Sequence, residues 1–155
     1  MLRQFLLSGA VSICNIAIHA VVMSVVVWAA RMTVGKHHVR LIAVMICTVS
    51  VLMVAHVLEV IVWSLAYAMV DAAPTGADLL YFAFVNYTTL GYGDLTPVER
   101  WRLVGPVTAM NGVLLFGWST AVIFEVLRRT AQMGQNPHTN LGLLKSNVGS
   151  SSTQR

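Results

Sequence analysis

The sequence has few charged residues and few cysteines. Asp, Glu, Lys and Arg together make up 10% of its 155 residues, and the only cysteines, Cys14 and Cys47, both lie inside apolar runs. A typical soluble domain carries about 25% charged residues, so this composition excludes a soluble enzyme and a nucleic-acid-binding domain. Two cysteines in apolar runs also argue against a disulfide framework. Apolar residues make up 57% of the chain and its mean hydropathy is +0.73, which predicts an integral membrane protein.

Several functional motifs are also missing from the sequence. It contains no phosphate-binding loop, no metalloprotease motif and no helix with the repeated arginines of a voltage sensor. His56 and Glu59 lie three residues apart, but two ligands are too few for a metal site within one chain. We therefore expect no enzymatic activity and no cofactor.

Three long apolar runs are present. Residues 5–30 and 103–124 contain no charged residue, and residues 41–70 contain only Glu59. Each run is long enough to cross a membrane as a helix, which takes about 20 residues. A cleaved signal peptide is the alternative for the first run, but the apolar part of such a signal is usually about 7–15 residues long. The sequence thus predicts an all-α membrane protein with three transmembrane helices.

A shorter apolar stretch, residues 79–88, lies between the second and third runs. It is too short to span a membrane, so we expect it to enter the membrane and return while surrounded by protein, because lipid cannot satisfy free backbone groups. Thr75 or Asp78 is expected to cap this helix. The sequence Thr96-Pro97-Val98-Glu99 has the pattern of a capping box and predicts that the last helix begins there and runs to about Arg129.

The distribution of charge predicts the orientation. Residues 31–40 contain three basic and no acidic residues, and residues 125–155 contain four basic residues and one acidic residue. Residues 71–102 contain four acidic and two basic residues. The positive-inside rule then places the first two segments in the cytoplasm and the N-terminus outside the cell membrane. The polar residues 130–155 are expected to form a disordered cytoplasmic tail.

Residues 88–94, with the sequence Thr-Thr-Leu-Gly-Tyr-Gly-Asp, have the properties of a cation site. A cation that loses its water needs several oxygen ligands, and backbone carbonyls supply them only if they point to one side. Gly91 and Gly93 permit this because glycine adopts left-handed backbone angles without steric cost. Leu90 and Tyr92 would then point away from the ion. Asp94 would concentrate cations at the outer mouth.

This string, together with the short helix before it and the spanning helix after it, resembles the pore domain of tetrameric potassium channels, whose filter motif is usually written TVGYG. The resemblance covers residues 41–129, and the whole arrangement is most similar to short bacterial ion-channel proteins with an extra leading helix. It implies a selectivity filter formed by Thr89, Leu90, Gly91, Tyr92 and Gly93, with K⁺ held at the first four.

The resemblance also implies a gating hinge at Gly112. Two residues depart from the family pattern: Leu90 stands where Val or Ile is usual, and Val85 stands where some members carry a carboxylate that pairs with the residue matching Asp94. For Gly112, close helix packing is an equally strong alternative to a hinge. Ser119 and Thr120 are expected either to line the cavity or to bond to carbonyls four residues back.

The predicted organisation has three parts: an extra helix and linker at 1–40, a pore domain at 41–129 and the tail at 130–155. Since each chain carries one filter string, four chains are needed, which predicts a homotetramer in lipid that passes K⁺ and takes no other small-molecule substrate. The alternatives are a less selective cation channel and a non-conducting membrane subunit that modulates a true channel.

A buried polar layer is the last expectation. Five polar residues lie deep within the predicted helices, about 17–22 Å from their outer ends at about 1.5 Å per residue. Polar groups at this depth are costly and usually bond to one another. The predicted network consists of Asn15, His19, His56, Glu59 and Asn111, with local backbone bonds for each residue as the alternative.

Overall fold

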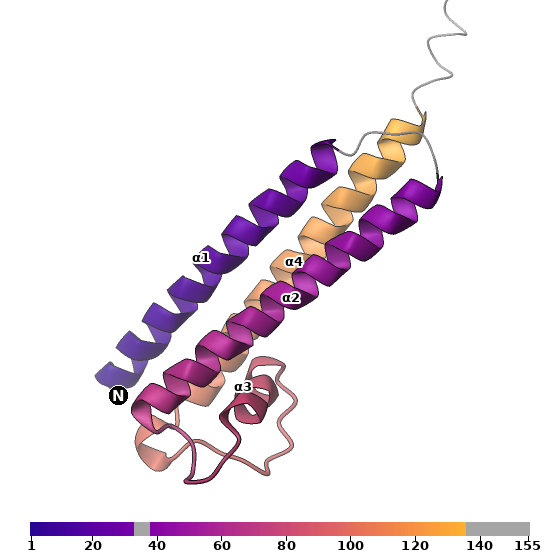
Figure 1. Cartoon of the computed structure of the whole chain (residues 1–155). Coiled ribbons are helices and arrows are strands. Elements are labelled where there is room, and N and C mark those ends of the chain that lie inside the picture. Colours follow the sequence, from indigo (N-terminus) through magenta and orange to yellow (C-terminus); the bar gives the residue numbers. More distant parts are fainter. Residues whose placement is uncertain (33–37, 136–155) are drawn as a thin grey trace, which may run out of the picture.

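The structure is a computed structural model that describes residues 1–32 and 38–135 (Figure 1). Its elements are α1 (Leu2–Met32), α2 (His38–Val70), α3 (Leu79–Tyr87), a single 3₁₀ turn η1 (Glu99–Trp101) and α4 (Val104–Gln135). No strand occurs in these described ranges. The expected all-α fold with three helices long and apolar enough to cross a membrane is confirmed. The predictions for residues 33–37 and 136–155 lie outside the described residues.

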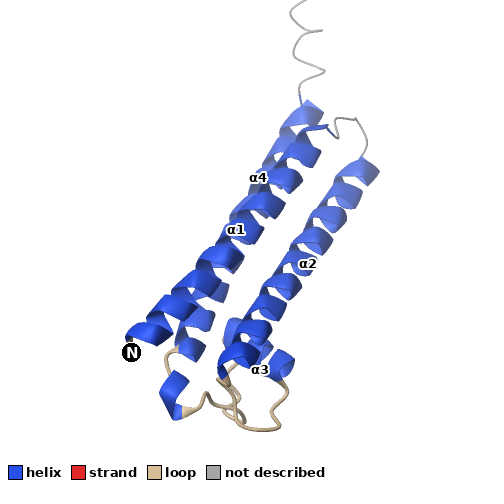
Figure 2. Ribbon diagram, turned by 60° about the vertical axis from the view of Figure 1, so that its left-hand side comes forward, coloured by secondary structure: helices blue, strands red, loops and turns tan. Residues whose placement is uncertain are grey.

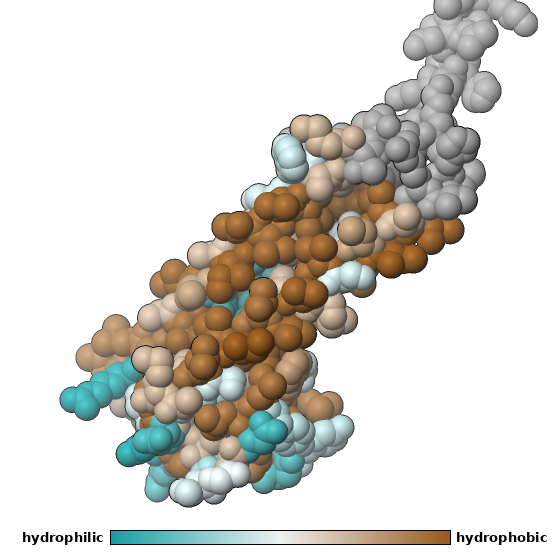
Figure 3. Space-filling view, in the orientation of Figure 1, coloured by the Kyte–Doolittle hydropathy of each residue, from teal (hydrophilic) through white to brown (hydrophobic). Residues whose placement is uncertain are grey.

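The three long helices lie side by side and alternate in direction (Figures 1 and 2). Each of α1, α2 and α4 contacts the other two, and α3 contacts α2 and α4. The N-terminus, α3 and residues 88–98 lie at one end of the bundle, here called the loop end (Figure 2). On the face drawn in Figure 3, apolar side chains cover the long helices and hydrophilic ones gather at the loop end. An apolar outer surface of this kind fits a lipid environment.

Aspartates cap the end of α2 and the start of α3. Asp71 follows α2 with φ +51°, and the N–H of Ala72 bonds back to the Tyr67 carbonyl at 3.1 Å, which is the left-handed C-terminal cap that stops many helices. Asp78 caps α3, since its Oδ1 accepts from the N–H of Leu80 at 3.0 Å and of Tyr81 at 3.1 Å. Of the two predicted caps, Asp78 is therefore the one used.

The predicted start of the last helix is wrong. Thr96 and Pro97 belong to no helix, and α4 begins only at Val104, after the turn η1. The reason is a tertiary hydrogen bond: the N–H of Val98 donates to the Ala72 carbonyl at 2.9 Å and holds Val98 extended at ψ 150°. At its other end α4 continues to Gln135, past the predicted end near Arg129.

The bundle contains two apolar clusters. The one nearer the loop end joins α2, α3 and the start of α4 around Trp63, Tyr67 and Phe82. The one nearer the far end joins α1, α2 and α4 around Met23, Leu52 and Val126. Buried polar residues lie between the two clusters along all three long helices, so the hydrophobic core is interrupted by a polar layer at mid-height.

Candidate functional site

The backbone of residues 88–90 is tied to the end of α3. The N–H of Thr88 donates to the Phe84 carbonyl at 2.9 Å, that of Thr89 to Asn86 at 3.1 Å and that of Leu90 to Val85 at 3.0 Å. The N–H groups of these three residues are therefore all bonded to carbonyls of α3. They also place the loop directly at the C-terminal end of α3, where the helix dipole is negative and favours a cation.

The backbone angle φ alternates between positive and negative values along the loop. Thr89, Gly91 and Gly93 have φ of +60°, +59° and +79°, and Leu90 and Tyr92 lie between them. The expected left-handed geometry at the two glycines is present. The positive φ of Thr89 was not anticipated, because it is unfavourable for a β-branched residue and is found where surrounding structure enforces it. Alternation of this kind turns successive carbonyls toward the same side of the strand.

The carbonyl oxygens of residues 89–93 accept no hydrogen bond from any group that the structure describes. The side chains of Leu90 and Tyr92 are 52% and 69% exposed in the single chain. The loop therefore has five carbonyl oxygens that accept no hydrogen bond from the described residues and two large exposed side chains.

Asp94 is held by a residue of α3. The Tyr81 hydroxyl donates to Asp94 Oδ2 at 2.6 Å, and this bond raises the pKa of Tyr81 above its usual value. No pattern in the sequence marked Tyr81 as a partner of Asp94. Val85, one turn further along α3, is buried. The position where the resemblance implies a carboxylate in some channels therefore holds an apolar side chain here, and Asp94 bonds to Tyr81.

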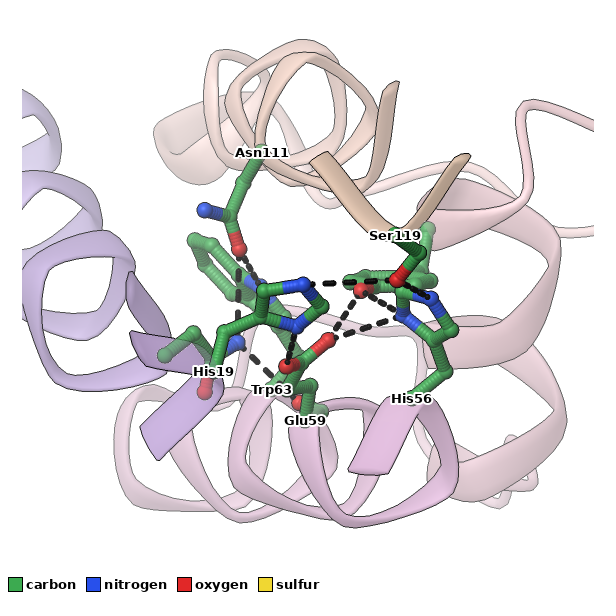
Figure 4. Close-up of polar contacts among 8 residues, drawn as sticks. His19, His56, Glu59, Trp63, Asn111 and Ser119 are labelled. Carbon is green, nitrogen blue, oxygen red and sulfur yellow. Dashed lines mark hydrogen bonds and ion pairs between the residues drawn. The ribbon is translucent and has the colours of Figure 1, made fainter. Parts of the chain in front are cut away.

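Glu59 is the centre of the polar layer (Figure 4). Its Oε1 lies 2.7 Å from His19 Nδ1, and its Oε2 lies 3.0 Å from His56 Nδ1. The Tyr87 hydroxyl also donates to Oε2, and it lies 2.9 Å from His56 Nδ1. His19 and Glu59 are completely buried. One carboxylate thus joins α1, α2 and the last residue of α3.

Residues of α4 complete the layer. Ser119 Oγ lies 2.9 Å from His56 Nε2 and 3.3 Å from His19 Nε2 (Figure 4). Asn111 Oδ1 accepts from Trp63 Nε1 at 3.0 Å and from Asn15 Nδ2 at 3.3 Å. Asn15 Nδ2 also donates to the Glu59 carbonyl at 3.2 Å. All four helices therefore contribute to the buried polar layer, whose members are Asn15, His19, His56, Glu59, Trp63, Tyr87, Asn111 and Ser119.

The structure brings together all five residues of the predicted network and adds three. Trp63, Tyr87 and Ser119 were missed as members. Trp63 carried a usable signal, because it lies one turn from Glu59 on the same helix face. Ser119 bonds to His56 and His19, whereas the sequence predicted that it either lines a cavity or bonds to the carbonyl four residues back. Thr120 does bond to the carbonyl four residues back, that of Phe116, at 2.9 Å.

A third potential metal ligand joins the two counted from sequence. Ligand atoms of His19, His56 and Glu59 all lie within 4.8 Å of one another, so the statement that only two were available is wrong. The set of two histidines and one carboxylate is one that Zn²⁺ uses. However, each histidine contacts a different carboxylate oxygen, at 2.7 and 3.0 Å, and two ligands of one tetrahedral Zn²⁺ lie about 3.3 Å apart. As placed, the three side chains are arranged for hydrogen bonding.

Gly112 of α4 packs against Tyr87, the last residue of α3. A Cβ at this position would come within 2.0 Å of the Tyr87 carbonyl oxygen, so only glycine fits without a backbone shift. This contact supports the packing interpretation of Gly112, while its role as a hinge stays a prediction. Gly117, five residues further along α4, has no atom within 4 Å of the corresponding position, so no close packing is made there within the described chain.

Comparison with known proteins gives one match. A family model described as "Ion channel" matches residues 55–129. No curated protein and no solved structure matches the chain. The matched segment begins within α2 and includes α3, the TTLGYGD loop and α4 up to Arg129. This part of the chain is therefore similar to an ion-channel family, and the three long apolar helices are those of a membrane protein.

Proposed function

We propose that four copies of this chain form a potassium-selective channel that conducts K⁺ passively. The observation that carries this proposal is the row of carbonyl oxygens at residues 89–93, which accept no hydrogen bond from the described residues and follow backbone angles of alternating hand. Carbonyl rings of this kind replace the hydration shell of K⁺ in channels. The string TTLGYGD and the ion-channel match support the same conclusion.

In the proposed mechanism, carbonyls of Thr89, Leu90, Gly91 and Tyr92 from four chains surround the ion in successive layers. No residue carries out covalent chemistry, and the ion moves down its gradient by passing from one layer to the next. The end of α3 supplies a negative dipole end at the base of the row. Asp94, exposed and bonded to Tyr81, raises the local cation concentration at the mouth.

The tetrameric state rests on two observations. One chain supplies only one strand of carbonyls, so a closed ring needs several copies. Leu90 and Tyr92 are largely exposed in the single chain, and a neighbouring subunit would cover them. In this assembly α1 packs on α2 and α4 and does not line the ion path. The excess of basic residues at the far end supports an orientation with the loop end outside and the C-terminus in the cytoplasm.

The experiment that tests the proposal is a flux assay on the purified full-length chain in liposomes. We expect K⁺ flux well above Na⁺ flux. In Gly91→Ala this flux should be lost, because a Cβ at φ +59° is strained and disturbs the carbonyl row. Gly117→Ala is the matched control, since its Cβ meets nothing within 4 Å. Equal K⁺ and Na⁺ fluxes would indicate a less selective cation channel, and no flux from intact tetramers would indicate a non-conducting modulatory subunit.

A further inference from the structure

The inward face of α1 carries a polar stripe. Its residues recur every three or four positions, which is the spacing of one helix face. Ser8, Asn15 and His19 are completely buried. The stripe runs from the loop end to the buried polar layer and consists of Gln4, Ser8, Ser12, Asn15 and His19. Gln4 bonds to the chain before α4, and Asn15 and His19 bond within the polar layer. The hydroxyls of Ser8 and Ser12 have no such role among the described residues.

Four buried polar atoms along this stripe and beside its inner end have no hydrogen-bond partner among the described residues. They are Ser8 Oγ, Ser12 Oγ, Asn15 Oδ1 and Asn111 Nδ2. Other hydroxyls in the same chain behave differently. Ser24 Oγ and Thr120 Oγ1 bond to the carbonyls four residues back, at 2.8 and 2.9 Å. Ser8 and Ser12 could turn back in the same way but are placed toward the bundle instead.

Unpartnered polar atoms are unfavourable inside a membrane protein. Leaving a buried hydroxyl or amide without a partner costs roughly 1–3 kcal/mol, and lipid offers no replacement. Bound water normally satisfies such groups, typically through about three hydrogen bonds to polar atoms around it. A run of these atoms at helical spacing is the pattern that a file of water molecules needs.

We propose that this stripe is a water-binding site: a file of water molecules between α1 and the rest of the bundle that reaches from the loop end to His19. Gln4 lines a surface hollow of about 710 Å³ at the loop end, together with Arg3, Asp71 and Arg100. This hollow is the mouth of the file. Beyond His19 the apolar cluster around Met23 and Val26 closes the bundle, so the file ends at the polar layer.

The file gives the buried polar layer access to protons by a route separate from the carbonyl row. The titratable groups that meet at its inner end are His19 of α1, His56 and Glu59 of α2 and Tyr87 of α3; α4 contributes the uncharged Asn111 and Ser119. Tyr87 bonds to Glu59 and immediately precedes the TTLGYGD loop. A proton delivered along the file therefore reaches groups that support the base of the loop.

The test uses single cysteines in the full-length chain in liposomes, after replacement of the exposed Cys14 and Cys47. Ser8→Cys and Ser12→Cys place thiols in the file. Ile13→Cys is the matched control, since Ile13 is the next residue on α1 and is 69% exposed on its outer face. Ag⁺, which is small and enters only hydrated space, is added to both sides, and the remaining free thiols are counted after denaturation. We expect the thiols at 8 and 12 to react roughly tenfold faster than the one at 13, because hydrocarbon holds no aqueous ion.

A second measurement uses the unmodified protein, in case a cysteine disturbs the packing. Water-edited solid-state NMR should show transfer from water to Ser8 and Ser12 and none to Ser24, whose hydroxyl bonds to its own helix. Equal Ag⁺ rates at positions 8, 12 and 13 together with no water transfer to Ser8 or Ser12 would overturn the proposal. Neither measurement depends on ion flux, so the result is independent of the proposed channel activity.

Discussion

The backbone of Gly112 packs directly against the carbonyl oxygen of Tyr87: a Cβ added at Gly112 would lie only 2.0 Å from that oxygen. Tyr87 is the last residue of α3, and its hydroxyl donates to Glu59 in the polar layer. One residue therefore connects the polar layer, the helix α4 and the chain that leads into the TTLGYGD loop. Close packing at Gly112 fixes the height of the loop relative to α4.

This contact predicts that Gly112→Ala destabilises the protein. The added methyl group has to push backbone aside, and overpacking of this kind costs about 1–3 kcal/mol or more. Thermal unfolding of the tetramer measures the change, with Gly117→Ala as the control that should leave stability unaltered. If Gly112 acts only as a hinge, Gly112→Ala would keep wild-type stability and change only the open probability, which would contradict the packing interpretation.

The bond between Tyr81 and Asp94 predicts an alkaline transition at the loop. Its formation raises the pKa of Tyr81, so the bond stabilises the folded state fully below the pKa of an unfolded tyrosine, about 10. Its contribution is lost as the pH rises through the higher folded pKa. Unfolding measured at a series of pH values above 10 should show this loss in the wild type. Tyr81→Phe should lack that step, and the same step in both proteins would rule out Tyr81 as its source.

The polar layer predicts a specific pattern of coupling between helices. Asn15 and Asn111 share a hydrogen bond of 3.3 Å, whereas no bond joins His56 to Asn111 among the described residues. Double-mutant cycles with alanine should give a coupling of about 0.6 kcal/mol, and at most about 1.7 kcal/mol, for Asn15 with Asn111, which are the mean and maximum for interhelical bonds in a membrane protein. The coupling of His56 with Asn111 should be smaller. The reverse order would contradict the arrangement described above.

Glu59 is expected to be the most sensitive position in the layer. Glu59→Gln replaces one carboxylate oxygen by an amide NH₂ in a site where both oxygens have partners. An NH₂ at the Oε2 position would face the Tyr87 hydroxyl, which donates there. Leaving such buried groups without partners should cost roughly 1–3 kcal/mol of tetramer stability. Glu99→Gln provides a control at an exposed position. Equal stability of the two variants would mean that the layer does not hold the helices together.

Much of this arrangement could be predicted from the sequence because strong, local signals determine it. Length and hydropathy alone predict the three long helices, and the two glycines of the TTLGYGD loop predict its left-handed angles. The depth of each polar residue along its helix predicts the five residues of the network. Depth can be read from the sequence because the rise per residue in an α-helix is constant, and polar groups at the same depth in lipid pair with one another.

The remaining features depend on tertiary contacts that local patterns do not contain. Thr96 has the sequence of a helix cap, but the bond from Val98 to Ala72 holds the chain extended there. Ser119 could not be assigned to the layer without knowing that two histidines from other helices face it. The unpartnered hydroxyls of Ser8 and Ser12 become visible only once burial is known.

The central claim, potassium-selective conduction, is tested most directly by the reversal potential of the reconstituted full-length chain with K⁺ on one side and Na⁺ on the other. The account predicts a reversal potential far from zero, with the sign of selective K⁺ permeation, because carbonyl rings replace the hydration shell of K⁺ better than that of Na⁺. A reversal potential near zero would contradict it.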